Sequence, residues 1–303
     1  MEKFDLHILG CGSALPTVRH NPSSQVLNLR EKLYMIDCGE GTQLQLRRSR
    51  LKFARLNHVF ISHIHGDHCF GLVGMISTFS MLGRTADLHV YAPKALEPIL
   101  RMELSTFCHG LEFKVVFHAH PDGYGLIYED PTVAVYALPL CHRVPSTGFL
   151  FCEKPVLPHI RRDMVDYLGI PFYAIRSIKE GAGWTAADGR VIPHERLVFP
   201  ADAPRRYAYC SDTTYLPRLA DYLHGVDLLF HEATFGEDNR VRAEETFHST
   251  ARQAAMLARD AGVKRLLIGH YSARYTDERV LLDEAREIFP DTLLAEEGMM
   301  LTL

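Results

Sequence analysis

The chain has 303 residues, 47% of them hydrophobic, a net charge of −4 at pH 7 and a mean hydropathy of −0.07. These values predict a soluble globular protein of one large or two ordinary domains, and the acidic charge alone disfavours a nucleic-acid partner. Seven scattered cysteines without a C-x-x-C pair argue against a disulfide framework and favour a reducing compartment. No signal peptide or membrane-spanning apolar run is evident, so we expect a cytoplasmic protein without a membrane partner.

Short strand-like segments alternate with helix-like segments along the chain, which predicts α/β layering. The expected strands are Phe4–Leu9, Gln25–Leu29, Leu33–Ile36, His58–Ile61, Leu88–Tyr91, Phe113–His118, Val133–Ala137, Gly148–Phe151, Tyr207–Tyr209, Leu228–His231, Leu266–Ile268 and Met299–Thr302. The expected helices are Thr42–Leu51, Leu72–Leu82, Pro93–Glu103, Arg161–Leu168, Thr214–Leu223, Ser249–Ala261 and Glu278–Ile288. We expect Ser249-Thr250 to cap the helix that follows it and Gly262 to end that helix.

The stretch of about 153–200 departs from this regular pattern because prolines and glycines interrupt its periodicity. We interpret it as an insertion that projects from one core domain covering residues 1–303. Between Lys154 and Arg206 there are nine Lys/Arg against six Asp/Glu, so this region is basic within an acidic chain. Such a patch is compatible with phosphate recognition. A second basic run (Arg47, Arg48, Arg50, Lys52 and Arg55) fits phosphate recognition, a solvated helix face or a subunit contact equally well.

The strongest chemical signal is the hexamer His63-Ile64-His65-Gly66-Asp67-His68, which follows an apolar run typical of a buried strand. His63 and His65 point to the same side of an extended chain and can share one metal ion. Asp67 and His68 follow a glycine and can turn towards a second ion. Neutral imidazoles with a carboxylate suit zinc, and paired ions about 3.5–4 Å apart form a known hydrolytic device.

Three further ligand-type residues lie one to three positions after strand-like runs, namely His142 after Val133–Leu140, Asp212 after Tyr207–Cys210 and His270 after Leu266–Gly269. Loops at strand ends converge on one face of an α/β protein, so we expect these residues to join the hexamer. We assign His63, His65 and His142 to one zinc ion, and Asp67, His68 and His270 to the other. We expect Asp212 to bridge the two Zn²⁺ ions. We expect Asp67 to orient the attacking water in addition to binding its ion.

Several motifs run in order across nearly the whole chain. They are the hexamer, Asp37-Cys38-Gly39-Glu40-Gly41-Thr42-Gln43, Leu140-Cys141-His142-Arg143, Cys210-Ser211-Asp212-Thr213, His231-Glu232-Ala233-Thr234-Phe235, Phe247-His248-Ser249-Thr250 and His270-Tyr271-Ser272-Ala273-Arg274-Tyr275. Together they resemble the motifs of ribonuclease Z, a tRNA 3′-processing endonuclease of the metallo-β-lactamase superfamily. The hexamer alone identifies only the superfamily, whereas the H-E-A-T, H-S-T and S-x-R-Y elements are far more specific.

The resemblance implies a four-layered αβ/βα sandwich and hydrolysis of precursor tRNA, leaving a 3′-hydroxyl on the tRNA and a 5′-phosphate on the trailer. It also implies that His248, poised by Glu232, gives a proton to the leaving oxygen, which suits a His–Glu pair. A structural alternative for His248 is a helix-capping neighbour of Ser249. The family is often dimeric, so we expect a homodimer.

By the same resemblance, the insertion at about 153–200 is the arm that grips the tRNA elbow. Arg176 and Lys179 are its candidate phosphate ligands, and Arg274 is either a phosphate clamp or part of a structural ion pair. The sequence departs from the family in the arm after Gly169-Ile170-Pro171. It departs again in the segment 16–21, where Val18 and His20 replace two basic residues of a loop linked to sensing the CCA end.

Two alternative functions compete with the nuclease. A general dizinc phosphodiesterase, or another hydrolase of this fold acting on small substrates, shares the hexamer. The His231–Phe235 and His248–Thr250 elements, with the arm-like insertion, favour the nuclease over it. A non-catalytic RNA-binding or scaffolding protein is the other alternative, and the seven intact ligand positions argue against it.

Overall fold

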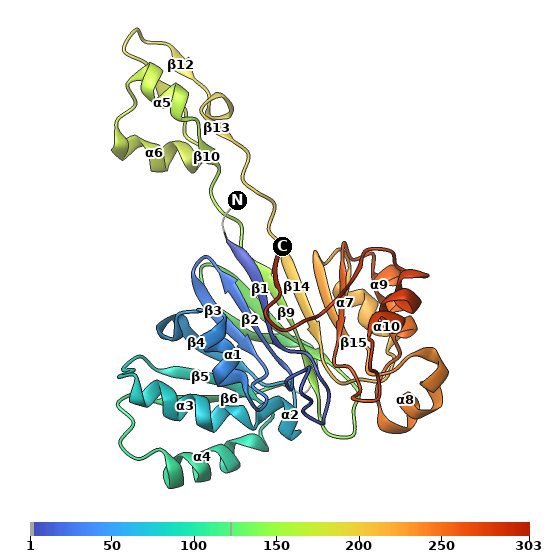
Figure 1. Cartoon of the computed structure of the whole chain (residues 1–303). Coiled ribbons are helices and arrows are strands. Elements are labelled where there is room, and N and C mark those ends of the chain that lie inside the picture. The colour runs from blue at the N-terminus through green and yellow to red at the C-terminus, as the bar shows by residue number, and fades with distance from the viewer. Residues whose placement is uncertain (1–2, 122) are drawn as a thin grey trace. The chain divides into compact units, whose positions relative to one another are not determined.

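The computed structural model describes residues 3–121 and 123–303, and the chain divides into two compact units. The larger unit, here called the body, comprises the described residues up to Cys152 and those from Arg205 to Leu303. The smaller unit, here called the arm, spans Glu153–Pro204. Figure 1 labels the strands and helices of both units.

Two seven-stranded sheets form the centre of the body (Figure 1). The strands of the first sheet, in spatial order, are β18 (Met300–Thr302), β1 (Phe4–Gly10), β2 (Ser24–Leu29), β3 (Lys32–Ile36), β4 (Leu56–Phe60), β5 (Leu88–Ala92) and β6 (Val115–Ala119). Those of the second sheet are β17 (Thr292–Leu294), β16 (Leu266–Gly269), β15 (Leu228–Glu232), β14 (Arg206–Cys210), β9 (Thr147–Glu153), β8 (Val133–Pro139) and β7 (Gly125–Glu129). Strands β3 to β6 run parallel, and so do β14 to β17.

Helices cover the outer face of each sheet, so the body has four layers (Figure 1). The helices against the first sheet are α1 (Thr42–Arg48), α3 (Gly71–Met81) and α4 (Leu96–Phe107). Those against the second sheet are α7 (Ala220–Leu223), α9 (Ala251–Ala261) and α10 (Arg279–Arg286). Two short helices, α2 (Gly66–Cys69) and α8 (Arg240–Thr246), lie outside these layers. The four-layered αβ/βα sandwich expected from the sequence is therefore confirmed.

The first sheet separates two apolar cores, because successive side chains of a strand point to opposite faces. In β5, Leu88 and Val90 join the core beneath the helices, whereas Tyr91 joins the core between the sheets. In β3, Met35 and Ile36 divide in the same way. A sheet that is buried on both faces needs apolar side chains at nearly every position, which is why these strands appear in the sequence as continuous apolar runs.

The arm has a small apolar core of its own, formed by Ile170, Ala174, Ile178, Leu197 and Val198. Its helices are α5 (Arg162–Leu168) and α6 (Phe172–Lys179). Its two short sheets pair β10 (His159–Ile160) with β13 (Val198–Phe199), and β11 (Trp184–Thr185) with β12 (Val191–Ile192). In the described ranges of the chain, no helix is long and apolar enough to cross a membrane.

Each expected strand overlaps an observed one, but the expected helix Thr214–Leu223 is wrong in its first part. A 3-10 turn at Pro217–Leu219 leads into α7, because proline lacks an N–H and is accommodated in the first turn of a helix. The caps of α9 are confirmed. Thr250 accepts a hydrogen bond from the Gln253 N–H in a capping box, and Gly262 ends the helix at a φ of 61°.

Candidate active site

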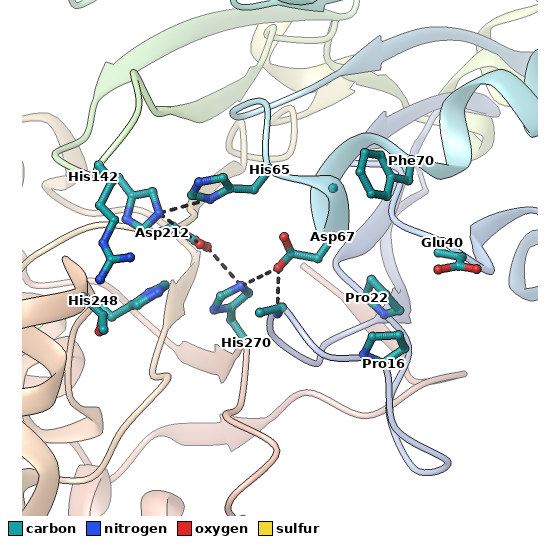
Figure 2. Close-up of a pocket in the computed structure, with 14 residues that line it drawn as sticks. Pro16, Pro22, Glu40, His65, Asp67, Phe70, His142, Asp212, His248 and His270 are labelled. Carbon is teal, nitrogen blue, oxygen red and sulfur yellow. Dashed lines mark hydrogen bonds and ion pairs between the residues drawn. The ribbon is translucent and has the colours of Figure 1, made fainter.

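One cavity of about 530 Å³ is lined by five of the seven side chains predicted to bind metal, those of His65, Asp67, His142, Asp212 and His270 (Figure 2), and the other two, His63 and His68, are buried. Asp212 follows β14 and His270 follows β16, and these strands belong to the parallel part of the second sheet. His142 follows β8 of the same sheet, and the hexamer follows β4 of the first sheet. The cavity therefore opens where loops from both sheets meet.

His63, His65, His142 and Asp212 form the first of two clusters of metal-binding atoms. The His65 Nδ1 lies 3.0 Å from the His63 Nε2 and 3.3 Å from the His142 Nε2. The Asp212 Oδ2 lies 3.6 Å from the His63 Nε2 and 3.7 Å from the His142 Nε2. These four atoms face a common centre, as ligands of one metal ion do.

Asp67, His68 and His270 form the second cluster. The Nε2 atoms of His68 and His270 are 3.3 Å apart, and both lie within 3.5 Å of the Asp67 Oδ2. The other oxygen of Asp212, Oδ1, lies 3.4 Å from the His68 Nε2 and 3.1 Å from the His270 Nε2. One carboxylate thus faces both clusters, which is the arrangement of a bridging ligand.

Outer hydrogen bonds fix which nitrogen each of these histidines presents to a cluster. The His142 Nδ1 donates to the Phe247 carbonyl at 2.8 Å, and the His68 Nδ1 donates to Asp37 at 2.8 Å. The His270 Nδ1 donates to the Thr234 hydroxyl at 2.9 Å. Each Nε2 is therefore left with its lone pair directed at the cluster, and such outer partners are typical of metal-binding histidines.

Electrostatics also favour metal binding. Burial lowers the pKa of His63 well below its usual value, and the charge on His68 adds to this effect, so His63 stays neutral. Burial likewise lowers the pKa of His142. Burial opposes ionisation of Asp212, but the surrounding imidazoles, His270 first, hold its pKa well below the usual range. Burial opposes protonation of His68, but the charges of Asp67, Asp212 and Asp37 raise its pKa well above the usual value, so binding of a divalent cation there releases a proton.

Asp37 is a fully buried carboxylate that supports the hexamer from behind. Its Oδ1 accepts the Ser62 backbone N–H at 2.7 Å. Its Oδ2 accepts the Ser62 hydroxyl at 2.9 Å, His68 at 2.8 Å and the Tyr209 hydroxyl at 2.7 Å. The Ser62 hydroxyl also lies 3.0 Å from the His63 Nδ1. Asp37 therefore orients ligands of both clusters without facing either of them.

His248 and Glu232 form a pair beside the second cluster. The His248 Nδ1 lies 2.9 Å from the Glu232 Oε1, and His248 lines the cavity (Figure 2). Burial alone lowers the pKa of His248, but the charge of Glu232 and their hydrogen bond raise it to about 9. The carboxylate of Glu232 is itself held by the Thr213 N–H and by the Thr234 N–H and hydroxyl. Because Thr250 caps α9, the capping alternative for His248 is not needed.

Three non-glycine residues of this site have strained backbone. Asp37, Phe247 and His270 all have positive φ values, of 56°, 59° and 63°, although none of them is glycine. Non-glycine residues in this region cost free energy and persist only where the surrounding structure holds them. His270 is held by a hydrogen bond from its N–H to the Cys11 carbonyl at 2.7 Å. Each strained residue supplies or supports a side chain of the clusters.

The basic residues proposed to meet phosphate do not line the cavity. Arg274 is exposed, its guanidinium bonds Asn239 and Ser272, and it lies 4.9 Å from the centre of the Phe235 ring. These partners are neutral, so the structural ion pair considered for Arg274 is not among its contacts. Arg176 and Lys179 lie on α6 of the arm, where Arg176 is exposed and paired with Glu180 at 2.9 Å.

Some supporting residues were not identified from the sequence. Ser62, Thr234 and the Phe247 carbonyl orient histidines, and the Ala14 N–H donates to the Asp67 Oδ2 at 2.8 Å. Thr234 belongs to the H-E-A-T element, so the sequence does carry a signal for it: a polar residue two positions after Glu232. Backbone groups such as those of Ala14 and Phe247 carry no signal in a sequence, because every residue has them.

Comparison with known proteins shows which superfamily the fold and the site belong to. The family model described as "Beta-lactamase superfamily domain" matches residues 115–271, and the one described as "Anti-Pycsar protein Apyc1" matches residues 4–124. The four-layered sandwich and the paired His/Asp clusters at its edge define a metal-binding hydrolase of the metallo-β-lactamase superfamily.

Similar proteins identify the family within this superfamily. Ribonuclease Z of Bacteroides thetaiotaomicron is 60% identical to this chain, and the alignment covers 100% of this chain and 96% of that protein. Ribonuclease Z of Phocaeicola vulgatus is 58% identical, and the alignment covers 100% of this chain and 98% of that protein. The crystal structure of the short form of human tRNase Z is 25% identical with a TM-score of 0.71, covering 98% of both chains. This chain belongs to the ribonuclease Z family, as its motifs predict.

Proposed function

We propose that the protein is a zinc-dependent endoribonuclease that removes the 3′ trailer from precursor tRNA. The products are a tRNA with a 3′-hydroxyl and a trailer with a 5′-phosphate. Membership of the ribonuclease Z family supports this activity. The observation that carries the mechanism is the position of Asp212, whose two oxygens face two clusters beside the His248–Glu232 pair. A phosphodiesterase for small substrates is not favoured by the full-length similarity.

The proposed cofactor is a pair of zinc ions per chain. His63, His65 and His142 would hold one ion, Asp67, His68 and His270 would hold the other, and Asp212 would offer one oxygen to each. The donor set fits, because imidazoles whose second nitrogens are held combine with carboxylates that stay ionised. When bound, the ions activate a water molecule as nucleophile and neutralise the charge that develops on the phosphoryl oxygens.

Asp67 and His248 carry the proton transfers in this proposal. The contacts of Asp67 with Ala14, His68 and His270 all fall on Oδ2, so Oδ1 is available to orient the attacking water and to accept its proton. The new bond joins that water oxygen to phosphorus, and the bond from phosphorus to the 3′-oxygen breaks. His248 donates its Nε2 proton to the departing 3′-oxygen, while Glu232 stabilises its positive charge through Nδ1.

The domain organisation that we propose is one metallo-β-lactamase-fold domain over residues 1–303 with a tRNA-binding arm inserted at about 153–200. Exposed aromatic side chains support this role, since Phe172 and Tyr173 are 89% and 81% exposed at the start of α6. Arg176 and Lys179 follow on the same helix. Aromatic and basic side chains together suit a nucleic-acid backbone and its bases. Arg274 remains our candidate for a phosphate contact on the body.

Family resemblance and a tRNA substrate lead to two further proposals, a homodimer and a cytoplasmic location. The homodimer is tested by light scattering during size-exclusion chromatography of the purified protein. A mass of twice 34.4 kDa supports it, and a monomer at working concentrations contradicts it.

The central experiment combines metal analysis with cleavage of an end-labelled precursor tRNA. We expect about two zinc ions per chain, and loss of cleavage when a chelator removes them. His68→Ala should abolish cleavage and lower the zinc content while precursor tRNA still binds, whereas the exposed His109→Ala should behave as the unmodified protein. Full activity of His68→Ala, or cleavage of small phosphodiesters without cleavage of tRNA, contradicts the proposal.

A further inference from the structure

An exposed aromatic ring lies in the same cavity as the proposed metal clusters. Phe70 follows α2 and precedes α3, and it is 74% exposed although it lines the cavity with Asp67, His65 and His270 (Figure 2). Its ring packs on Gly66, where a Cβ atom would approach the ring carbon Cε2 to 2.2 Å. The glycine of the hexamer therefore makes room for a ring that gains little burial from the protein itself.

The surroundings of Phe70 select the kind of group that fits there. Pro16, Pro22 and Glu40 line the same end of the cavity, away from His248 and His142 (Figure 2). Glu40 is exposed, and its carboxylate disfavours a phosphate group at this end. Two proline rings and an aromatic ring form an apolar wall. A flat, uncharged group suits this end of the cavity better than a phosphate does.

We propose that Phe70 is the stacking platform for the base of the first trailer nucleotide, the one immediately 3′ of the scissile phosphate. This inference rests on the proposed function. His248 must stand next to the 3′-oxygen, which belongs to the tRNA, so the tRNA side of the substrate occupies the His248 end of the cavity. The trailer continues from the same phosphate in the other direction, towards Phe70. Stacking on one ring tolerates any base, which suits trailers of varied sequence.

The test measures kcat/KM on precursor tRNAs that differ only at one position. On the normal precursor, Phe70→Ala should lower kcat/KM by about tenfold to a hundredfold, the loss expected for one base–aromatic stack. On a precursor whose first trailer nucleotide is abasic, wild type and Phe70→Ala should cleave at the same rate. Phe70→Trp should retain most of the activity, and the equally exposed Phe107→Ala, on α4 outside the cavity, should change nothing.

The outcomes separate this inference from the proposed function. Failure of the wild type to cleave any precursor tRNA overturns the proposed function itself. Cleavage by the wild type with no loss in Phe70→Ala, or with the same loss on the abasic trailer, overturns only the platform. If instead an abasic nucleotide on the tRNA side of the cut removes the difference between wild type and Phe70→Ala, the ring stacks on the tRNA side. That result also overturns the platform.

Discussion

Three histidines of the site each owe their orientation to one hydrogen-bond acceptor outside the clusters. For His142 this acceptor is a backbone carbonyl, for His68 a buried carboxylate and for His270 a hydroxyl. None of these acceptors faces a cluster, yet each decides which nitrogen does. Changes at the acceptors should therefore affect metal binding without removing a ligand.

Asp37→Asn tests this supporting role. The amide cannot accept all the hydrogen bonds that Asp37 receives from Ser62, His68 and Tyr209, so His68 loses its fixed orientation. We expect zinc affinity to fall about tenfold to a hundredfold, measured by competition with a chromophoric chelator. Asp130→Asn is the matched control, because Asp130 also accepts several hydrogen bonds but its partners include Thr132 and Lys32 rather than site residues. Equal zinc affinity in Asp37→Asn and wild type contradicts the role.

His248→Ala tests the proton donor through the leaving group. Cleavage of precursor tRNA, whose leaving 3′-oxygen needs a proton, should fall by about 10²- to 10⁴-fold. A precursor with sulfur in place of that 3′-oxygen releases a stable thiolate, so the variant should cleave it at a rate close to wild type. Asp212→Ala should lose activity on both substrates. If His248→Ala loses the same factor on the sulfur-containing precursor, His248 is not the proton donor.

At the scale of elements, the strands of the core were easier to predict than the short peripheral ones. Strands buried on both faces appear directly in the sequence as apolar runs, as in β16 and in Leu228–Phe230 of β15. The edge strands β7 and β17 were missed, because β7 is only partly buried and β17 has three residues. The sequence pattern does not predict helix α6, because Pro171 and Gly181 flank this short helix and interrupt the periodicity of the region.

Helix α9 begins three residues after His248, so its cap stabilises an element next to the site. Thr250→Ala removes the hydroxyl that accepts the Gln253 N–H, and we expect the free energy of unfolding to fall by about 1 kcal/mol. Thr106→Ala within α4, where the hydroxyl only bonds the Met102 carbonyl, should change it by less than about 0.5 kcal/mol. Urea unfolding of both variants measures the difference, and equal midpoints contradict the importance of the cap.

At the scale of the whole molecule, the chain consists of a body that carries the chemistry and an arm that carries a basic and aromatic surface. The two units have separate apolar cores. Substrate binding by the arm and catalysis by the body should therefore respond to different substitutions.

The double variant Arg176→Glu and Lys179→Glu tests the arm in the intact protein. Both side chains lie on α6, so their reversal should raise KM for precursor tRNA and leave hydrolysis of a small phosphodiester unchanged. The dependence of log affinity on log salt should become shallower by about two, one unit for each lost phosphate contact. Arg259→Glu on α9 of the body is the control. An unchanged KM, or equal losses on both substrates, contradicts a role of the arm in binding.

The sequence by itself determined the kinds of residue at the site and their local spacing, the central strands, the caps of α9 and the family. These features depend on neighbours in the chain, and so they are visible without a fold. Only the tertiary structure decided that the two oxygens of Asp212 face different clusters, that the Phe247 carbonyl orients His142, and that Phe70 stands in the cavity. His68 and His270 are 202 positions apart, and they meet only because the packing of two sheets brings their strand ends to one edge.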